Sequence, residues 1–327
     1  MPISSVAAAD FDEVPLIAIG ALGGGDASET QAIQQIRHAA ETVGFFYIAD
    51  HGVPAAATKD ILEQARRFFD LPLAQREAIL LTRSSCYRGY LPFGARGNNS
   101  ARPPDILESF NVGPELGPDT PEVRAGKPLH GPNQWPENLP GFRSSVLAYY
   151  AELEALMRRL VDAFALALEL PREALRGQYR RPLTQLRLLH YPPQPPQIDD
   201  QFGVRAHQDT DFLTILLQDG KGGLEVRNRA GNWIPAPPRP ETFVVNVGEM
   251  LELVTSGRFP ATLHRVVNRT GAERYSVPFF ISPDFDAVLE PLPQWRDDRQ
   301  QRAAPFHVGN SMAAFFRGLW PSAGASR

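Results

Sequence analysis

Apolar positions in the N-terminal half of the chain recur mainly at helical spacing. Ser28 and Gln31 resemble a capping box, and the apolar pattern that follows them ends at Gly44. A second amphipathic helix is expected over residues 61–69. The longest stripe occupies residues 142–169, where apolar side chains three or four positions apart predict a scaffold helix that faces the core.

The same half contains two strand-like runs and one long irregular region. VPLIAI at residues 14–19 and FFYIAD at residues 45–50 are apolar runs of strand length. Residues 82–136 are rich in Gly, Pro, Asn and Arg, which predicts loops, apart from a strand in ILESFNV. This half is therefore expected to supply helices and a few strands around the core.

After Pro182 the pattern changes to short β-rich runs separated by turns. The runs are LTQLRLLHY, FLTILLQ, GLEVRN, NWIPA, TFVVNV, ATLHRVVN and RYSVPFFI. Strands this short at regular spacing favour a sandwich or a barrel. Residues 307–320 are expected to form a closing helix. The pattern as a whole predicts helices packed around a C-terminal β core.

Composition and charge narrow the class of protein. Of the 327 residues, 43% are hydrophobic and 21% are charged, which is ordinary for a soluble globular enzyme. The formal net charge of −4 gives no overall basic surface, so nucleic acid is not an expected partner. The 31 prolines favour loops and strand edges over a helical bundle.

The single cysteine and the lack of long apolar runs favour the cytoplasm as the compartment. With only Cys86, the chain has no intramolecular disulfide and no multi-cysteine zinc site, and inert packing is the expected role of the thiol. The N-terminus lacks the basic region and apolar core that are typical of a signal peptide. No apolar run approaches about 18 residues, so no membrane span is predicted, and the cytoplasm is the expected compartment.

The first candidate chemistry lies in RAHQDTDFLTILLQDG, residues 205–220. His207 and Asp209 are two residues apart, so on a strand they would point the same way and could share one cation. Asp211 would share that face if the strand stayed regular, which makes it a competing carboxylate. Alone the motif is weak, because a polar turn capped by Asp209 also explains it.

Two further motifs follow on later β-rich runs. His264 begins one run, and Arg274 and Ser276 lie two residues apart at the start of the next. Arg and Ser together on a buried strand suit an anion, because Arg offers a planar fork to a carboxylate; a salt bridge to Asp or Glu is the alternative. Two His and one carboxylate leave metal positions open, as in the facial triad of non-haem Fe(II) oxygenases. A hydrolytic zinc is the rival metal.

These motifs and their order resemble the Fe(II)/2-oxoglutarate dioxygenases of the isopenicillin N synthase-like superfamily, over nearly the whole chain. The resembling segments are VPLIAI, AETVGFFYIADHGVP, YRGYLPFG, ILESFNVG, LHYPPQP, HQDTDFLTILLQD, GGLEV, NWIPAPP, VVNVGEMLELVTSGRFPATLHRVVN and RYSVPFFISP. The resemblance implies a single α+β domain, in which a distorted double-stranded β-helix, or jelly roll, is flanked by helices.

The resemblance also divides the chain into expected regions. Residues 1–120 would form the N-terminal region of helices and strands, and residues 121–182 the region of the long scaffold helix. Residues 183–290 would form the jelly-roll core that binds Fe(II) and 2-oxoglutarate, and residues 291–327 the C-terminal tail and helix.

Site residues are implied position by position. The implied Fe(II) ligands, which are also the catalytic residues, are His207, Asp209 and His264. The implied 2-oxoglutarate ligands are Arg274 and Ser276, on the distal carboxylate, and Tyr191, which often donates to that group in the family. Leu189 departs from the pattern of many plant members, which have Asn there, so the co-substrate contacts on that side are left open.

Three residues are candidates for the substrate pocket. Arg88, in CYRGY, is near a position where relatives contact a substrate carboxylate, and a structural arginine is the alternative. Phe110 and Phe280 are candidate pocket walls, with plain core packing as the alternative for both. Asn246 is expected to satisfy backbone groups near the metal-bearing strands.

The implied activity is that of an oxygenase that uses Fe(II), 2-oxoglutarate and O₂. It would oxidise, by default hydroxylate, a small-molecule metabolite and release succinate and CO₂. The alternatives are an isopenicillin N synthase-like oxidase that does not use 2-oxoglutarate, an ethylene-forming or desaturating variant, and a non-enzymatic jelly-roll binding module. The tail GLWPSAGASR lacks the Gln that ligates iron in that oxidase, which disfavours the oxidase. The sequence names neither the substrate nor the oligomeric state.

Overall fold

Two β-sheets face each other and share an apolar layer. The computed structural model describes residues 10–95, 104–194, 202–296 and 305–320. The large sheet has the strand order β1 (Leu16–Ala18), β2 (Phe45–Ala49), β10 (Phe243–Val247), β7 (Leu213–Gln218), β12 (Arg274–Asp284), β5 (Pro182–Tyr191), β4 (Glu108–Val112) and β3 (Gly89–Leu91). The small sheet has the order β6 (Val204–His207), β11 (His264–Val266), β8 (Leu224–Arg227) and β9 (Trp233–Pro235).

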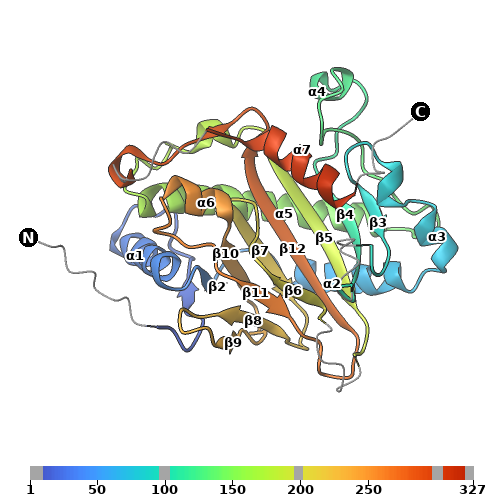
Figure 1. Cartoon of the computed structure of the whole chain (residues 1–327), viewed down its shortest axis with the longest axis horizontal. Coiled ribbons are helices and arrows are strands. Elements are labelled where there is room, and N and C mark those ends of the chain that lie inside the picture. Colours follow the sequence, from blue (N-terminus) through green and yellow to red (C-terminus); the bar gives the residue numbers. More distant parts are fainter. Residues whose placement is uncertain (1–9, 96–103, 195–201, 297–304, 321–327) are drawn as a thin grey trace, which may run out of the picture.

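Helices flank the sheets, and the longest one covers the outer face of the large sheet. The described helices are α1 (Ala27–Thr42), α2 (Ala55–Phe69), α3 (Leu73–Glu77), α4 (Pro121–Arg124), α5 (Phe142–Ala167), α6 (Glu249–Val254) and α7 (Val308–Leu319). Strands β13 (Val288–Leu289) and β14 (Phe306–His307) form a ribbon before α7. Figure 1 shows α5 passing behind the large sheet. In the described part of the chain, none of the helices combines the length and the apolar character that a membrane crossing requires.

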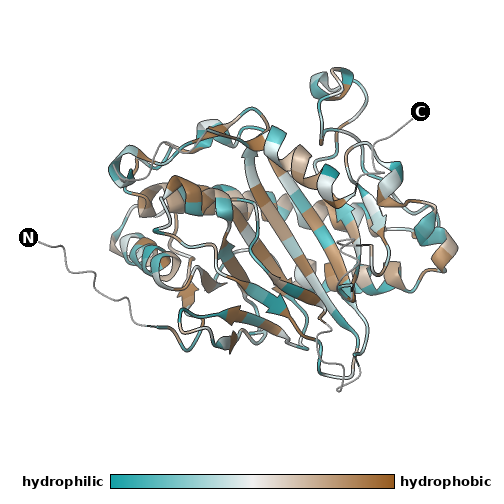
Figure 2. Ribbon diagram, in the orientation of Figure 1, coloured by the Kyte–Doolittle hydropathy of each residue, from teal (hydrophilic) through white to brown (hydrophobic). Residues whose placement is uncertain are grey.

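Helix α5 is the scaffold because its apolar stripe is continuous. Val146, Leu153, Leu160 and Phe164 are fully buried and join the main core, in which they meet the outward side chains of the large sheet. Helices α1 and α2 pack beside α5. Figure 2 shows hydrophobic residues along the strands that α5 covers. The helix predicted over residues 142–169 is therefore confirmed, with its end two residues earlier.

Alternation along β5 and β12 gives the large sheet a core face and a cavity face. The two strands pair with Arg274 opposite Tyr191 and Phe280 opposite Gln185. We call the cavity-facing side chains the inner row; they are Leu183, Gln185, Arg187, Leu189 and Tyr191 on β5, and Arg274, Ser276, Pro278, Phe280 and Ser282 on β12. The positions between them, such as Leu186 and Phe279, point into the helical core.

Helix α1 has its cap two residues earlier than the sequence suggested. The side chain of Asp26 accepts the N–H of Glu29 at 2.9 Å, and Glu29 in turn accepts the N–H groups of Gly23 and Gly25. The capping box predicted at Ser28 was therefore wrong, because Asp26 caps the helix and Ser28 already lies in its first turn.

Several short elements escaped the sequence pattern, among them β3 and α6, and the strand expected to run through residues 207–211 is interrupted. Strand β3 and helix α6 are each too short to give a periodic signal. Strand β6 ends at His207, so Asp209 and Asp211 lie in the turn before β7. The expectation that His207 and Asp209 share a strand face was wrong, although the two side chains still meet, as shown below.

Candidate active site

Two histidines and an aspartate converge where β6 and β11 meet. His207 ends β6, His264 begins β11, and the two residues are direct partners in the antiparallel register. Oδ1 of Asp209 lies 3.6 Å from Nε2 of His207 and 3.8 Å from Nε2 of His264. One ligand atom from each residue lies within 4.8 Å of the others. The three side chains, which we call the triad, therefore surround one point.

Backbone carbonyls fix both imidazoles of the triad. Nδ1 of His207 lies 2.8 Å from the carbonyl oxygen of Arg205, and Nδ1 of His264 lies 3.1 Å from that of Thr262. A carbonyl only accepts, so each Nδ1 carries the proton and each Nε2 keeps its lone pair for the shared point. Two neutral imidazoles and one carboxylate fit a divalent ion such as Fe(II), and three protein ligands leave positions open on it.

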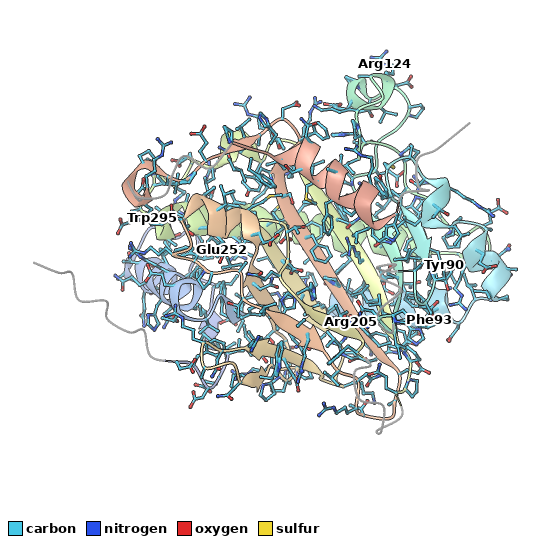
Figure 3. The ribbon with its side chains drawn as sticks, in the orientation of Figure 1. Tyr90, Phe93, Arg124, Arg205, Glu252 and Trp295 are labelled. Carbon is cyan, nitrogen blue, oxygen red and sulfur yellow. The ribbon has the colours of Figure 1, made fainter. Side chains whose placement is uncertain are left out.

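Neighbouring elements hold the loop that leads to His264. Glu252 on α6, labelled in Figure 3, accepts the N–H of Ala261 at 3.2 Å, and Gln208 donates to the carbonyl of the same residue. Burial raises the pKa of Glu252 although that hydrogen bond opposes the shift. The ring of Phe45 on β2 packs edge-on against His264 with the centroids 5.1 Å apart. Both sheets therefore contribute to the placement of this ligand.

The two carboxylate oxygens of Asp209 have different surroundings. Oδ1 faces the imidazoles, whereas Oδ2 accepts hydrogen bonds from Oγ1 of Thr214 at 2.6 Å and from Nδ2 of Asn246 at 2.8 Å. Burial opposes ionisation, but without a metal the positive charge of the imidazoles in their protonated form, together with the Thr214 bond, holds the pKa of Asp209 below its ordinary value. Asn246 was expected to serve backbone groups, and the structure places its side chain on this carboxylate instead.

Asp211, the competing carboxylate, lies outside the triad. Its Oδ2 accepts the N–H of Ile281 at 3.2 Å and lies 3.1 Å from Oγ1 of Thr214. Burial and the charge of Asp209 raise the pKa of Asp211 well above its ordinary value. A Cβ at Gly248 would collide with the Asp211 carbonyl, so this glycine lets α6 close on the turn. Asp211 therefore supports the turn and is not one of the three groups that converge on the metal point.

A buried guanidinium lies on the inner row near the triad. Arg274 is 1% exposed; its Nε donates to the carbonyl of Gly222 at 2.5 Å, and its Nη1 lies 3.4 Å from Oγ of Ser276. Its guanidinium carbon lies 4.6 Å from the centre of the Tyr191 ring, and the hydroxyls of Ser276 and Tyr191 are 3.5 Å apart. These contacts include no carboxylate from the described residues. A buried cation flanked by two hydroxyls and without a counter-charge suits an anion.

Two cavities adjoin at the triad, and we name each after its arginine. The Arg274 cavity contains the whole triad. The Arg88 cavity contains Arg88 and, of the triad, His207 and Asp209. The wall residues that both cavities share are His207, Asp209, Arg187 and Phe280. Two cavities that share walls at one metal point could hold two small molecules side by side.

Arg187 is a wall residue that the sequence reasoning missed. Its guanidinium carbon lies 4.6 Å from the centre of the Phe280 ring, and it donates to Oε1 of Gln185 at 2.8 and 2.5 Å. The alternation in LTQLRLLHY puts Arg187 on the same face as Tyr191, and that was the available signal. Phe280 lines both cavities, as expected of a pocket wall.

Arg88 is a buried arginine in the wall of the Arg88 cavity. It is 5% exposed, its Nη2 donates to the carbonyl of Leu129 at 3.3 Å, and its Nε has no hydrogen-bond partner among the described residues. The side chain fits there because residue 113 is glycine, where a Cβ would collide with the guanidinium. Within the described ranges, no acidic side chain forms a salt bridge with Arg88.

Phe110 lies on the opposite face of the sheet from both cavities. Its ring is fully buried among helices, with its centroid 4.6 Å from that of Phe68 and 5.3 Å from that of Phe142. The expectation of a pocket wall was therefore wrong. Strand alternation turns its neighbours Ser109 and Asn111 into the Arg274 cavity instead.

Leu189 faces the Arg274 cavity at the position where many plant members carry Asn. Its cross-strand partner is Ser109, and the next inward residue on that strand is Asn111. Oδ1 of Asn111 has no hydrogen-bond partner among the described residues. Strand β4 thus supplies polar groups to the cavity beside Leu189, where β5 has none. This arrangement could not be predicted without knowing how the two strands pair.

Two family models match the chain in sequence order. The one described as "non-haem dioxygenase in morphine synthesis N-terminal" matches residues 14–138. The one described as "2OG-Fe(II) oxygenase superfamily" matches residues 182–283, which include the triad, Arg274 and Ser276.

Curated relatives extend this similarity over most of the chain. A 2-oxoglutarate-Fe(II) type oxidoreductase of Aspergillus fumigatus is 34% identical over 297 residues, which are 89% of this chain and 88% of that protein. A homoarginine-6-hydroxylase of Glycine max is 34% identical over 300 residues, which are 87% of this chain and 90% of that protein.

Solved structures share the fold. A full-length Neurospora crassa protein, solved in complex with alpha-KG, superposes with a TM-score of 0.83 at 26% identity and covers 92% of this chain and 95% of that one. JOX2 in complex with 2OG, Fe and JA superposes with a TM-score of 0.78 at 26% identity and covers 93% and 85%. The expected fold, a single domain with a jelly-roll core flanked by helices, is confirmed.

Proposed function

The chain belongs to the 2OG-Fe(II) oxygenase superfamily, and on that premise we propose that it hydroxylates a small molecule that carries a carboxylate. It is a non-haem dioxygenase that uses Fe(II) as its metal, and 2-oxoglutarate and O₂ as co-substrates. Succinate and CO₂ are the products formed from 2-oxoglutarate. The residue roles below are part of the proposal.

We assign Fe(II) to His207, Asp209 and His264, and the convergence of this triad is the observation that carries the proposal. The support is that both Nε2 atoms and Oδ1 of the aspartate face one point, with the imidazole tautomers fixed from behind. When bound, Fe(II) and 2-oxoglutarate together supply the oxidising chemistry, and the chain orients them. Zinc would accept the same donors, so the choice of Fe(II) follows from the family.

The distal carboxylate of 2-oxoglutarate is the anion that we assign to Arg274. The guanidinium offers a planar fork, and the hydroxyls of Ser276 and Tyr191 stand beside it as further donors. Because the group is buried, a carboxylate placed there would pair with it at low local dielectric. The Arg274 cavity contains the triad as well, so one molecule of 2-oxoglutarate could span from the arginine to the metal.

The charges of the Arg88 cavity favour an acidic substrate. Arg88 is a buried cation there, and the acidic residues of the wall are Asp209 and Asp211. Asp209 is assigned to the metal, and Oδ2 of Asp211 is held by Ile281 and Thr214, so that neither carboxylate pairs with Arg88 among the described residues. A substrate carboxylate would therefore supply the missing negative charge. Homoarginine, for which the Glycine max relative is named, carries such a carboxylate.

Apolar side chains line the rest of the Arg88 cavity. Phe280, Phe316, Met312 and Leu183 form walls near His207. With its carboxylate on Arg88, a substrate would lay its carbon skeleton along these walls towards the metal point. Such walls also limit water at the bond to be oxidised.

A paired-substrate screen tests the proposal. Purified protein with Fe(II), ascorbate and 2-oxoglutarate is given small carboxylic acids and the matching uncharged amides, and O₂ uptake, succinate and product mass are measured. We expect certain acids to stimulate succinate formation with a gain of one oxygen atom in the product, and their amides to be poor. Equal turnover of the amides would contradict the acidic substrate class. Uptake of O₂ with substrate and Fe(II) alone, without succinate, would instead indicate the oxidase alternative.

A further inference from the structure

We propose that Thr214 and Asn246 are positioning residues that hold Asp209 as a one-oxygen ligand, which keeps its second oxygen off the metal. The inference rests on the proposed Fe(II) site. Both side chains donate to the same atom, Oδ2, at 2.6 and 2.8 Å. The other oxygen, Oδ1, is the one that faces the two imidazoles.

The large sheet fixes the two donors relative to each other. Thr214 on β7 and Asn246 on β10 are direct partners in the antiparallel register, and both are 2% exposed. Asp209 itself lies in a turn. The N–H of Glu249 binds the carbonyl of Asp209 at 2.8 Å and so fixes its main chain, but not the rotation of its carboxylate. The two strands therefore set an orientation that the turn alone would leave free.

The Thr214 hydroxyl has one proton to give and two carboxyl groups within reach. It lies 2.6 Å from Oδ2 of Asp209 and 3.1 Å from Oδ2 of Asp211. The shorter distance assigns the proton to Asp209. Asp211 also accepts the N–H of Ile281, so its oxygen is not left unsatisfied by this assignment.

The consequence concerns the number of open metal positions. A carboxylate binds a metal ion through one oxygen or through both. Two donors occupy the lone pairs of Oδ2, so Oδ1 alone remains for the metal. A facial triad must leave half of an octahedral ion open for a chelating co-substrate and for O₂. An Asp209 that turned both oxygens to the metal would take one of these positions away.

Near-isosteric variants separate this role from a general role in stability. Thr214→Val and Asn246→Leu each remove a donor, and the double variant removes both. Thr214→Ser keeps the hydroxyl. Thr255→Val is the matched control, because it removes a buried hydroxyl at the end of α6 whose hydrogen bonds involve the carbonyl of Leu251 and the N–H of Phe259 and do not involve Asp209.

Mn(II) is the probe, because its bound waters can be counted. Water-proton relaxation gives the number of exchangeable waters on the bound ion, and anaerobic calorimetry gives the affinity of the Mn(II)-loaded protein for 2-oxoglutarate. We expect the double variant to hold fewer waters than wild type and to bind 2-oxoglutarate at least about tenfold more weakly. Thr214→Ser and Thr255→Val should match wild type in both measurements.

A double variant with the wild-type water number and the wild-type 2-oxoglutarate affinity would overturn the proposal. If the double variant does not fold, Asn246→Leu alone carries the same test, with the same two readouts. A wild-type protein that binds no stoichiometric Mn(II) would instead show that the metal assignment itself is wrong.

Discussion

Arg274 is the residue on which binding of 2-oxoglutarate should depend most. Truncation in Arg274→Ala would leave a carboxylate unpaired in a buried place, so we expect the KM for 2-oxoglutarate to rise by about a hundredfold or more. Arg274→Lys should also be poor, because an ammonium cannot reproduce the fork. Arg265, which pairs with Glu225 in the small sheet, offers the control Arg265→Ala with an unchanged KM. Steady-state kinetics with 2-oxoglutarate varied make the measurement, and an unchanged KM in Arg274→Ala would refute the assignment.

Arg88 should affect the other substrate only. If its guanidinium holds the substrate carboxylate, Arg88→Ala should raise the KM for that substrate by the equivalent of about 2–4 kcal/mol. The KM for 2-oxoglutarate should stay at its wild-type value, because Arg88 does not line the Arg274 cavity. Varying each substrate in turn separates the two constants. If the substrate KM does not change, Arg88 is a packing residue.

The geometry of the triad assigns the metal to the carboxylate of Asp209 and not to that of Asp211. His207→Ala and His264→Ala should lose stoichiometric Fe(II) and turnover while remaining folded, and Asp209→Glu should be impaired because an extra methylene displaces the carboxylate. Asp211→Asn should keep its iron, since Asp211 lies outside the triad. Anaerobic Fe(II) titration, with circular dichroism as the check on folding, decides this. If Asp211→Asn lost its iron and Asp209→Asn kept it, the metal ligand would be Asp211 and not Asp209.

At the level of elements, the sequence predicts long periodic segments well. It predicts short elements, and which strands pair with each other, poorly. The stripe in α5 is continuous, so its position could be predicted, whereas α6 is only six residues long and gave no periodic signal. Phe110 was misplaced for a different reason. Which face of β4 meets the helices depends on its pairing with β5, and no local pattern encodes that pairing.

The same limit applies to the candidate site. The triad and the Arg274–Ser276 pair could be proposed because each stands in a short motif with characteristic spacing. Thr214 and Asn246 could not, because they are distant in the chain and meet only through the pairing of β7 with β10. Residues that act through strand pairing stay hidden until the sheet order is known.

The start of α1 should depend on pH through Glu29. Bidentate hydrogen bonds from Arg172 outweigh burial and lower the pKa of Glu29 from 4.5 to about 2. Its ionised form therefore adds stability that is complete above about pH 4.5 and is lost as the pH falls towards 2. Glu29→Gln should lower the free energy of unfolding by about 1–3 kcal/mol at pH 7, and by steadily less from pH 4.5 downwards.

Urea unfolding at several pH values measures this difference. The exposed Glu63, which pairs with Arg66 on the surface of α2, provides the control Glu63→Gln with a small effect at every pH. A Glu29→Gln deficit that stays constant down to pH 2 would show that the ionised carboxylate is not its cause.

For the whole molecule, the candidate site connects the two sheets, so its ligands should stabilise the entire fold. The histidines of the triad belong to the small sheet, and Arg274 belongs to the large sheet. Ligands that bind only the native state at about 100 times their Kd add about 2.7 kcal/mol each. We expect Mn(II) to raise the melting temperature and 2-oxoglutarate to raise it further, with the second increase absent in Arg274→Ala. A full second increase in that variant would contradict the assignment of Arg274.

The inner row of β5 and β12 has a consequence for protein engineering. Tyr191 and Arg274 are register partners at one end of the row and line only the Arg274 cavity. Leu183 and Ser282 are register partners at the other end and, of the two cavities, line only the Arg88 cavity. A library of variants confined to positions 183 and 282 would therefore reshape the pocket for new acids while the co-substrate end stays intact. Substitutions at this end of β5 and β12 should therefore change which substrates bind without changing the residues assigned to Fe(II) and 2-oxoglutarate.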